Sequence, residues 1–419
     1  MSTATVTCCV HGIRSAFSPK QISFSTGTDL SMLLESSIGP KGLSPTAADL
    51  VDLAAAVYQI DRHITSWRGT NPPTRIQLRM KLRHPNAWSD SAIQALQAAL
   101  HLLGNAVWEV EFEPGLKARI PEHQKEEARP IDQVALFSGG VDSTCGAITL
   151  STAIANTRLV SFYRGQKTLQ RSLASELGFA TPIQWCIDWK QKPGRGHFFY
   201  FRSFLFLALA GAVAESWNAR TIYQFENGIL ATAIPPASSW MMTKHAHPFL
   251  HKSMIELFAD LFGGRWKIIN PFLTLTKQEC VKQAVSAMEE GRVMRLLAQT
   301  ETCWYLRSNN VYGGVKKPGT PCGICVPCVL RRTAIPNERY RYNLLRDPIK
   351  DDKKKGEAFR AYYAFLSKVL DAGHSTAKFY GALPAAGRKL AEENCGVTLN
   401  DLHRLFLTFA QEFMETFLT

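Results

Sequence analysis

The segment 138–143 reads Ser-Gly-Gly-Val-Asp-Ser and directly follows a short apolar run. Its glycines let the backbone turn tightly and bring bare N–H groups close to an oxyanion, and the N-terminus of a following helix adds a partial positive charge. The hydroxyls of Ser138 and Ser143 can donate to phosphate oxygens, whereas Asp142 can cap the helix or hold Mg²⁺ on a pyrophosphate group. The pattern therefore predicts a phosphate-binding loop between a strand and a helix.

The glycine spacing separates this loop from two better-known phosphate-binding motifs. No Gly-Lys-Ser/Thr follows, so it is not a Walker A loop, and the spacing also differs from the dinucleotide-binding fingerprint. A loop that holds the β- and γ-phosphates without a transferring lysine suits attack at the α-phosphate, which releases pyrophosphate. The alternative is an ordinary strand–turn–helix built from small residues. The complete Ser-Gly-Gly-x-Asp-Ser pattern makes us prefer phosphate binding.

Three cysteines lie within seven residues, at Cys322, Cys325 and Cys328, and Cys303 lies 19 residues upstream. In a reducing compartment such spacing indicates a metal site rather than a disulfide. Four cysteines suit tetrahedral Zn²⁺ in a closed, structural site. Cys303 is the expected fourth ligand, and Cys280 is the alternative. The cysteines other than the four expected ligands are expected to be small buried hydrophobic residues: Cys8, Cys9, Cys145, Cys186, Cys280 and Cys395.

The bulk composition is that of an ordinary globular enzyme. The chain has 419 residues, enough for two or three domains, with 46% hydrophobic and 20% charged residues. It lacks an apolar run of about 20 residues and a basic N-terminal region followed by an apolar core, so we expect a cytoplasmic protein without a membrane segment. The net charge of +13 suits an anionic partner. No basic stripe is interleaved with aromatic residues, so nucleic acid is not required.

The order of expected elements indicates an α/β fold with a doubly wound, mostly parallel sheet between residues 131 and 335. Short apolar strands alternate there with helices, and a later helix is expected at 276–290. The expected strands lie at 131–137, 157–163, 182–187 and 221–224, and the helices at 142–155, 168–177 and 201–217.

The two flanks differ from this central part. Residues 1–125 mix strands with helices, including an expected helix at 47–67 and a half-exposed strand at 75–82, and are expected to form a separate N-terminal α/β accessory domain. A charged segment bounded by prolines, residues 114–130, is expected to be a linker. Residues 336–419 are expected to form a C-terminal helical subdomain.

The Ser-Gly-Gly-x-Asp-Ser loop resembles that of the PP-loop (N-type) ATP pyrophosphatase superfamily. A second motif consists of Cys303 and the segment 322–331, Cys-Gly-Ile-Cys-Val-Pro-Cys-Val-Leu-Arg. Together the two motifs resemble the 7-cyano-7-deazaguanine synthase (QueC) family. The resemblance covers residues 131–335. Three further segments match that family in the same order along the chain, at residues 162–166, 201–203 and 271–279.

The resemblance implies a PP-loop/HUP-like fold that uses ATP, Mg²⁺ and Zn²⁺. Its substrate would be 7-carboxy-7-deazaguanine or a related deazapurine, whose carboxylate is adenylated before an amine displaces AMP. The zinc would brace the loop that reads the deazaguanine and would perform no chemistry.

Carried over by position, the resemblance also assigns roles to individual residues. Asp142 is a catalytic residue, and Lys277 and Arg202 neutralise charge at the α-phosphate. Without the motif context, the lysine would be a surface residue and the arginine a helix-start residue. The implied ATP-binding residues are Ser138, Gly139, Gly140, Val141, Asp142 and Ser143, and the residues implied to line the nucleoside or substrate pocket are Gln166, Glu226 and Asn227.

Three features lie outside the ordinary synthase: residues 1–125, an insertion at 304–321 and the helical tail after residue 346. In this layout the chain resembles the longer QueC-like proteins encoded in bacterial anti-phage defence operons. Added domains suggest a macromolecular acceptor, because free ammonia needs no domain to dock it. We therefore expect an ATP-dependent carbon–nitrogen ligase that joins the activated carboxylate to an amine, the N-terminal amine of a partner protein from the same operon.

Three alternatives stay open at this point. The first is 7-cyano-7-deazaguanine synthesis with ammonia, in queuosine or other deazaguanine biosynthesis. The second is tRNA modification by a PP-loop enzyme, which needs an RNA-binding domain and a catalytic cysteine pair such as Cys145 and Cys186. The third is a nucleotide-binding subunit that has lost catalysis.

Overall fold

The computed structural model forms two compact units. The first, called the sheet unit below, comprises Met1–Ser138, Ala153–Gln224 and Thr243–Ile269. The second, called the helical unit, comprises Gly139–Thr152, Phe225–Met242 and Asn270–Thr419. The structure describes residues 5–10, 21–24, 30–34, 38–66, 75–116, 120, 130–163, 165–189, 200–237, 240, 242–304, 320–342, 344, 355–393 and 395–418.

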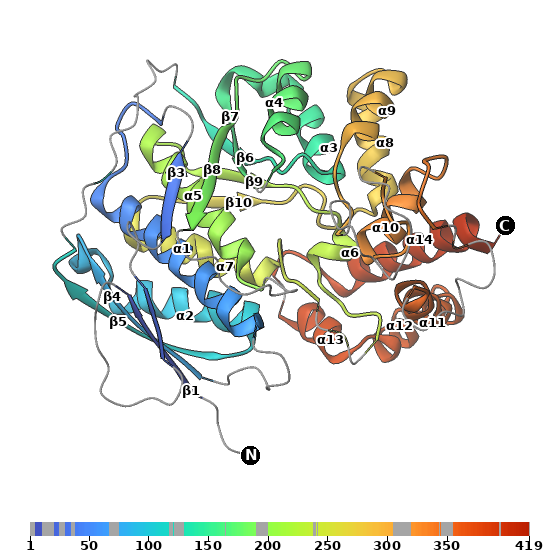
Figure 1. The fold of residues 1–419 in the computed structure, drawn as a ribbon. Coiled ribbons are helices and arrows are strands. Elements are labelled where there is room, and N and C mark those ends of the chain that lie inside the picture. Colours follow the sequence, from blue (N-terminus) through green and yellow to red (C-terminus); the bar gives the residue numbers. More distant parts are fainter. Residues whose placement is uncertain are drawn as a thin grey trace. The chain divides into compact units, whose positions relative to one another are not determined.

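The sheet unit contains a six-stranded sheet in the order β10-β9-β6-β7-β8-β3 (Figure 1). The pairs β10–β9, β9–β6, β6–β7 and β7–β8 are parallel, and only β3 is antiparallel to its neighbour β8. The expected α/β fold with a mostly parallel central sheet is therefore confirmed. The strands are β3 (Leu30–Leu34), β6 (Gln133–Leu136), β7 (Thr157–Phe162), β8 (Ile183–Trp189), β9 (Thr221–Gln224) and β10 (Lys267–Ile269).

Strand β6 is the first of the five parallel strands in the chain and lies at their centre. The next two strands extend the sheet on one side of β6, and the last two extend it on the other side. The direction of winding therefore reverses beside β6. In open α/β sheets such a reversal leaves a crevice at the carboxyl ends of the strands, where ligands bind.

A second sheet of the same unit has the order β2-β1-β4-β5 and is parallel throughout. Its strand β4 alternates between buried and more exposed residues, as expected from its sequence. Strand β3 also belongs to residues 1–125, and it completes the six-stranded sheet. The expected domain boundary and linker fall largely on residues outside the described part of the chain, so they stay predictions. The strands are β1 (Thr5–Val10), β2 (Gln21–Phe24), β4 (Arg75–Leu82) and β5 (Val107–Pro114).

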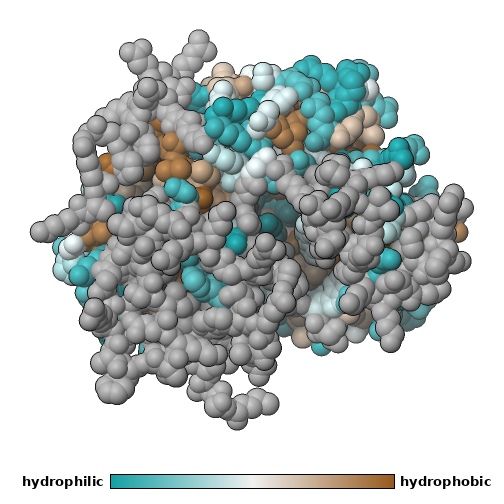
Figure 2. All heavy atoms as spheres, in the orientation of Figure 1, coloured by the Kyte–Doolittle hydropathy of each residue, from teal (hydrophilic) through white to brown (hydrophobic). Residues whose placement is uncertain are grey.

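Helices pack against one another and against the strands within the sheet unit. Helix α1 packs against α5, and α2 packs against α7 and β5. Helix α5 is apolar on almost all sides, which is typical of a helix inside a core. Helix α4 is amphipathic, and the side chains over it are mainly hydrophilic in Figure 2. These helices are α1 (Pro45–Ser66), α2 (Asp90–Gly104), α4 (Lys167–Glu176), α5 (Arg202–Trp217) and α7 (Pro248–Phe262), with short 3-10 helices at Pro85–Ala87 and Ser151–Asn156.

The helical unit contains no strand among its described residues. Its C-terminal helices α11, α12 and α14 pack together through aromatic side chains, such as Phe359 against Phe413. The expected C-terminal helical region is therefore confirmed. Within the described residues, no helix is both long and apolar enough to cross a membrane. The helices are α3 (Val141–Thr149), α6 (Gly228–Ala231), α8 (Lys277–Ala287), α9 (Glu290–Gln299), α10 (Val326–Ala334), α11 (Glu357–Ala372), α12 (Thr376–Ala382), α13 (Ala385–Glu392) and α14 (Leu399–Leu418).

Candidate functional site

The segment 138–143 leaves strand β6 and runs directly into helix α3. Gly139 adopts a left-handed backbone conformation with a φ of 78°, which strains any residue that carries a Cβ. Gly140 is the N-cap of α3 and has no side-chain oxygen to accept from the first N–H groups of the helix. Backbone N–H groups at the N-terminus of a helix favour an anion. The local geometry is therefore the tight glycine turn between a strand and a helix that the sequence predicts.

Asp142, in the first turn of α3, forms a buried ion pair with Lys277. The Nζ atom of Lys277 lies 2.6 Å from Oδ1 and 2.7 Å from Oδ2 of the carboxylate. The side chains of Lys277 and Asp142 are only 1% and 9% exposed. Asn227 donates to the same Oδ2 atom at 3.0 Å. Three residues that are distant in the sequence thus form one cluster in the helical unit.

The pair shifts both ionisation equilibria. Burial raises the pKa of Asp142, but the charge of Lys277 and the hydrogen bonds from Lys277 and Asn227 outweigh burial, so the pKa lies below its ordinary value. Burial lowers the pKa of Lys277, but the charges of Asp142 and Glu226 outweigh it, so this pKa lies above its ordinary value. Both members of the pair are therefore charged at neutral pH.

Lys277 is held in place by the N-terminal cap of α8. The hydroxyl of Thr276 accepts from the backbone N–H of Glu279 at 3.1 Å, and the Glu279 carboxylate accepts from the backbone N–H of Thr276 at 2.8 Å. This reciprocal pair is a capping box. Because Lys277 is the first residue of the helix, the cap fixes the point from which its side chain reaches Asp142.

Glu226 and Asn227 follow strand β9 and lie beside the ion pair. Asn227 caps α6 and is fully buried, so it supports the cluster from inside. Glu226 accepts from the side chain of Asn227 at 3.0 Å. The side chain of Asn270 binds both the N–H and the carbonyl of Glu226, at 3.3 and 2.8 Å. No local pattern in the sequence singles out Asn270, because its role depends on this tertiary contact.

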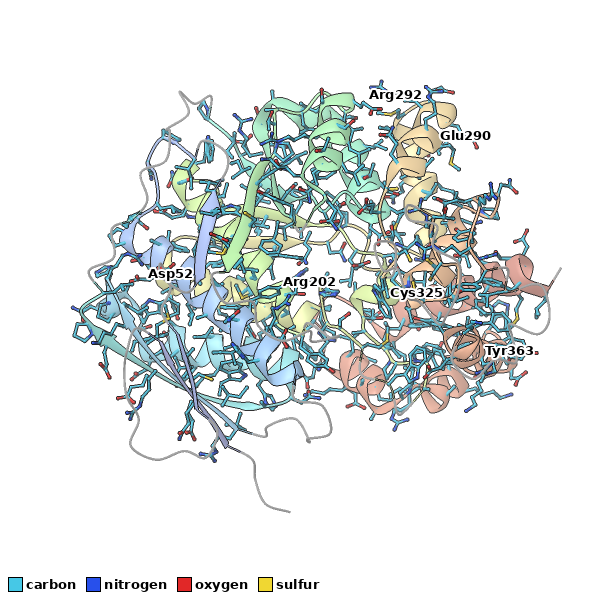
Figure 3. All side chains as sticks on the ribbon, viewed as in Figure 1. Asp52, Arg202, Glu290, Arg292, Cys325 and Tyr363 are labelled. Atoms are coloured by element: carbon cyan, nitrogen blue, oxygen red, sulfur yellow. The ribbon has the colours of Figure 1, made fainter. Side chains whose placement is uncertain are left out.

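Three of the expected site residues belong to the sheet unit. Ser138 is exposed at the end of β6, and Gln166 is the N-cap of α4. Arg202, labelled in Figure 3, is the first residue of α5, and its Nη2 atom lies 2.7 Å from Nε2 of His245. Nδ1 of the same histidine lies 2.5 Å from the hydroxyl of Ser203. The parts that Ser138, Gln166 and Arg202 play in nucleotide or substrate binding stay predictions.

The four expected metal ligands come together in the helical unit. The Sγ atoms of Cys303, Cys322, Cys325 and Cys328 all lie within 4.8 Å of one another. Figure 3 labels Cys325, the N-cap of α10. Gly323 has a φ of 81°, and a Cβ there would lie 2.7 Å from a carbonyl oxygen, so the turn between Cys322 and Cys325 requires glycine.

This cluster fits a tetrahedral metal ion such as zinc. A Zn–S distance of about 2.3 Å places two ligand sulfurs about 3.8 Å apart in a tetrahedron. The Sγ atoms of Cys322 and Cys328 are 3.8 Å apart. The backbone N–H groups of Ile324 and Cys325 donate to the Cys322 sulfur at 3.4 and 3.3 Å, which stabilises a thiolate. Among the described residues, the metal cluster does not include Cys280, the alternative ligand.

The surroundings of Asp142 do not match the expected Mg²⁺ site. Lys277 donates to both carboxylate oxygens, and Asn227 donates to one of them. A cation at Asp142 would have to displace an ammonium group that is already buried there. We therefore derive no step from Mg²⁺ at this carboxylate.

Comparison with protein-family models and with curated proteins finds no match for this chain.

Proposed function

We propose that this protein is an ATP-dependent carbon–nitrogen ligase of the PP-loop class with a HUP-like fold, similar to the QueC family. The loop 138–143 would hold the outer phosphates of ATP. Two features of the fold support this. The winding of the sheet reverses beside β6, and the loop follows the carboxyl end of that strand, where α/β sheets of this topology bind ligands.

The observation that carries the proposal is the buried pair of Asp142 and Lys277 at the start of α3. A buried ammonium group next to an anion-binding turn can stabilise charge that develops on the α-phosphate. Asp142 belongs to the loop motif itself and binds Lys277 through both oxygens. Its role in this proposal is to hold the ammonium group in a fixed position beside the phosphates.

The first step of the proposed reaction activates a carboxylate. A carboxylate oxygen of 7-carboxy-7-deazaguanine attacks the α-phosphorus of ATP, the acyl–phosphate bond forms, and the bond to the β-phosphate oxygen breaks. Pyrophosphate leaves with the negative charge, which the helix N-terminus stabilises. In the second step an amine nitrogen attacks the acyl carbon, AMP leaves, and the nitrogen loses a proton to give an amide.

The acceptor in this proposal is the N-terminal amine of a partner protein, as part of an anti-phage defence system. The resemblance to long QueC-like proteins supports it. Residues 1–125 and the helices after residue 355 also support it, because free ammonia would need no additional domain to dock it. Four cysteines would hold zinc, which would brace the loop that carries them without taking part in the reaction.

The tRNA-modifying alternative is less well supported. It needs a reactive thiolate, and Cys145 is fully buried in α3. Burial raises the pKa of this thiol above its ordinary value, which keeps it protonated.

The proposal is tested by exchange of labelled pyrophosphate into ATP. We expect exchange that depends on 7-carboxy-7-deazaguanine, and a loss of at least about 100-fold in Lys277→Met, because a transition-state charge partner is removed. Lys282→Met is the matched control, since Lys282 is exposed on the same helix. Absence of exchange with the wild-type protein and this substrate would refute carboxylate adenylation.

The acceptor is identified in a separate experiment. The protein is incubated with ATP, 7-carboxy-7-deazaguanine and either ammonia or the purified product of a neighbouring gene. Intact-mass spectrometry should show the partner heavier by one deazaguanine acyl group at its N-terminus. An unmodified partner together with free nitrile would instead support the alternative of 7-cyano-7-deazaguanine synthesis.

A further inference from the structure

The segment 300–303 connects the phosphate loop to the metal cluster within the helical unit. The backbone N–H of Glu301 donates to the carbonyl of Gly139 at 3.2 Å. The backbone N–H of Val141 donates to the hydroxyl of Thr302 at 3.4 Å. The next residue, Cys303, belongs to the metal cluster. Two consecutive residues thus contact the loop directly before a metal ligand.

Arg331 fixes the same segment from the other side. It lies on α10, three residues after the metal ligand Cys328, and is fully buried. Its Nη1 atom donates to the carbonyl of Thr300 at 3.2 Å and to the hydroxyls of Thr300 and Thr302 at 2.8 and 3.2 Å. The carboxylate of Glu338 balances its charge at 2.5 and 2.7 Å.

The hydroxyl of Thr302 is the shared atom of these contacts. It accepts from the N–H of Val141 in the loop and from the guanidinium of Arg331 on the metal-binding helix. A hydroxyl oxygen has two acceptor lone pairs, so it can make both bonds at once. A buried arginine with this many bonds has little freedom to move. Displacement of either end therefore has to move the other end or break one of these two partly buried hydrogen bonds.

A bound metal would hold both ends of this connection. It would join Cys303, which follows Thr302, to Cys328, which precedes Arg331 by one helical turn. Without it, the hydrogen bonds of the Arg331 side chain would remain the main connection between the two chain segments.

We propose that metal binding at the four-cysteine cluster and anion binding at the loop 139–143 are coupled, and that Thr302 is the positioning residue that couples them. That the anion is the pyrophosphate part of ATP rests on the proposed function; the coupling itself does not. Coupling between two sites is reciprocal and typically changes affinity by about 5- to 150-fold. The metal site would thus set the geometry of the phosphate loop without touching the nucleotide.

The test uses Thr302→Val in the full chain, with two companions. Thr302→Ser restores the shared hydroxyl. Thr333→Val is the matched control, because it removes a buried threonine hydroxyl that bonds to the carbonyl of Leu330 in its own helix and not to the loop. Zinc content is measured for each protein. ATP affinity is measured by calorimetry, and amide hydrogen exchange of the peptide that covers residues 139–149 is measured by mass spectrometry.

We expect Thr302→Val to keep its zinc, to bind ATP about tenfold more weakly and to exchange the loop amides faster than the wild type. Thr302→Ser and Thr333→Val should match the wild type in both measurements. Removing zinc from the wild type with a chelator should weaken ATP binding and speed loop exchange as Thr302→Val does. Removing zinc from Thr302→Val should change these two measurements less than it does in the wild type.

Three results would overturn the coupling. Loop exchange that is the same with and without zinc would show that the sites are independent. Wild-type exchange and affinity in Thr302→Val would exclude Thr302 as the connection. Tighter ATP binding by Thr302→Val would show that its hydroxyl competes with the anion for Val141. If the wild type binds no ATP, the proposed function fails, and hydrogen exchange alone still decides whether the metal controls the loop.

Discussion

Among the described residues, two buried pairings of a cation with carboxylates invite comparison, one in each compact unit. In the sheet unit, Arg83 contacts Asp49 at 2.9 Å and Asp52 at 2.7 Å. In the helical unit, Lys277 contacts Asp142 at 2.6 Å. The carboxylate of Asp49 is fully buried and that of Asp142 is 9% exposed. Distance and burial alone therefore do not distinguish the two clusters.

The donors to the carboxylates do distinguish them. Asp49 accepts from the backbone N–H groups of Arg83 and His84 at 3.0 and 2.8 Å, so it satisfies the chain that leaves β4. The hydrogen bonds to Asp142 come from the side chains of Lys277 and Asn227. A carboxylate that satisfies backbone groups stabilises the fold. One that orients a buried cation beside a glycine turn at a helix N-terminus is a candidate for chemistry.

The largest expected effect is that of removing the lysine. Lys277→Met leaves the Asp142 carboxylate buried without its cation, so we expect a loss of about 3–5 kcal/mol in the free energy of unfolding. Arg83→Met should cost less, about 1–3 kcal/mol, because Asp49 keeps its backbone donors. Urea denaturation measures both. Equal losses of stability in the two variants would show that the backbone donors to Asp49 do not make its cluster different from that of Asp142.

A pH-dependent effect of intermediate size is expected at Glu412. This side chain on α14 accepts from the hydroxyl of Thr276 at 2.8 Å, and its Oε2 atom has no partner among the described residues. Burial, together with the nearby charge of Glu279 and against those of Lys282 and Arg404, raises the pKa of Glu412 to about 7. The protonated form is therefore favoured in the folded state. Its stabilisation is complete below about pH 4 and is lost as the pH rises through 7.

Glu412→Gln removes this dependence. Between pH 4.5 and pH 8 the wild type should lose about 2–3 kcal/mol of stability relative to the variant, because each pKa unit corresponds to about 1.4 kcal/mol. Denaturation curves at both pH values measure the difference. Glu415→Gln, at an exposed position of the same helix, is the control. If the difference in the free energy of unfolding between Glu412→Gln and the wild type is the same at both pH values, Glu412 is ionised at both.

A smaller effect of the same sign is expected at Asp52, labelled on α1 in Figure 3. Burial raises its pKa despite the opposing charge of Arg83. The free energy of unfolding of Asp52→Asn should therefore increase relative to that of the wild type as the pH rises from 4 to 7, by up to about 1 kcal/mol. Asp142 has a lowered pKa, so its contribution has the opposite sign and is lost as the pH falls. A decrease in the stability of Asp52→Asn relative to the wild type between pH 4 and pH 7 would contradict the argument that burial raises the pKa of Asp52.

The smallest effect is expected for the exposed pair of Arg404 and Glu279. Their side chains are 45% and 24% exposed and lie 2.7 Å apart. Arg404→Ala should change stability by less than about 1 kcal/mol, because solvent screens exposed pairs. A loss as large as that of Lys277→Met would mean that Arg404 is needed to hold the cap of α8.

Local signals in the sequence predicted much of the helical unit's site. The loop 138–143 and three of the metal ligands are defined by short spacings, and the structure has a strand, turn and helix at the first and a cluster at the second. The contact of Asp142 with Lys277 spans 135 residues, so it could be anticipated only from the order of the motifs. Spacing alone also left the choice between Cys303 and Cys280 open.

Other contacts had no local signal. Thr302 and Arg331 are ordinary residues in the sequence, and their role arises because one hydroxyl serves two chain segments. The hydrogen bond from the Asn227 side chain to Asp142 likewise joins residues 85 positions apart in the sequence. Strand β3 did not stand out because an edge strand of five residues, paired on one side, shows little hydrophobic periodicity.

The position of β3 has a practical consequence for shortened versions of this protein. Leu30–Leu34 covers the outer edge of β8 along the whole register from Trp185 to Trp189. A version that starts at residue 131 would leave that edge with unsatisfied N–H and C=O groups, which are a template for pairing with another molecule. Such a version would be prone to aggregate even with every motif residue present. Expression trials should therefore keep the first strands of the chain.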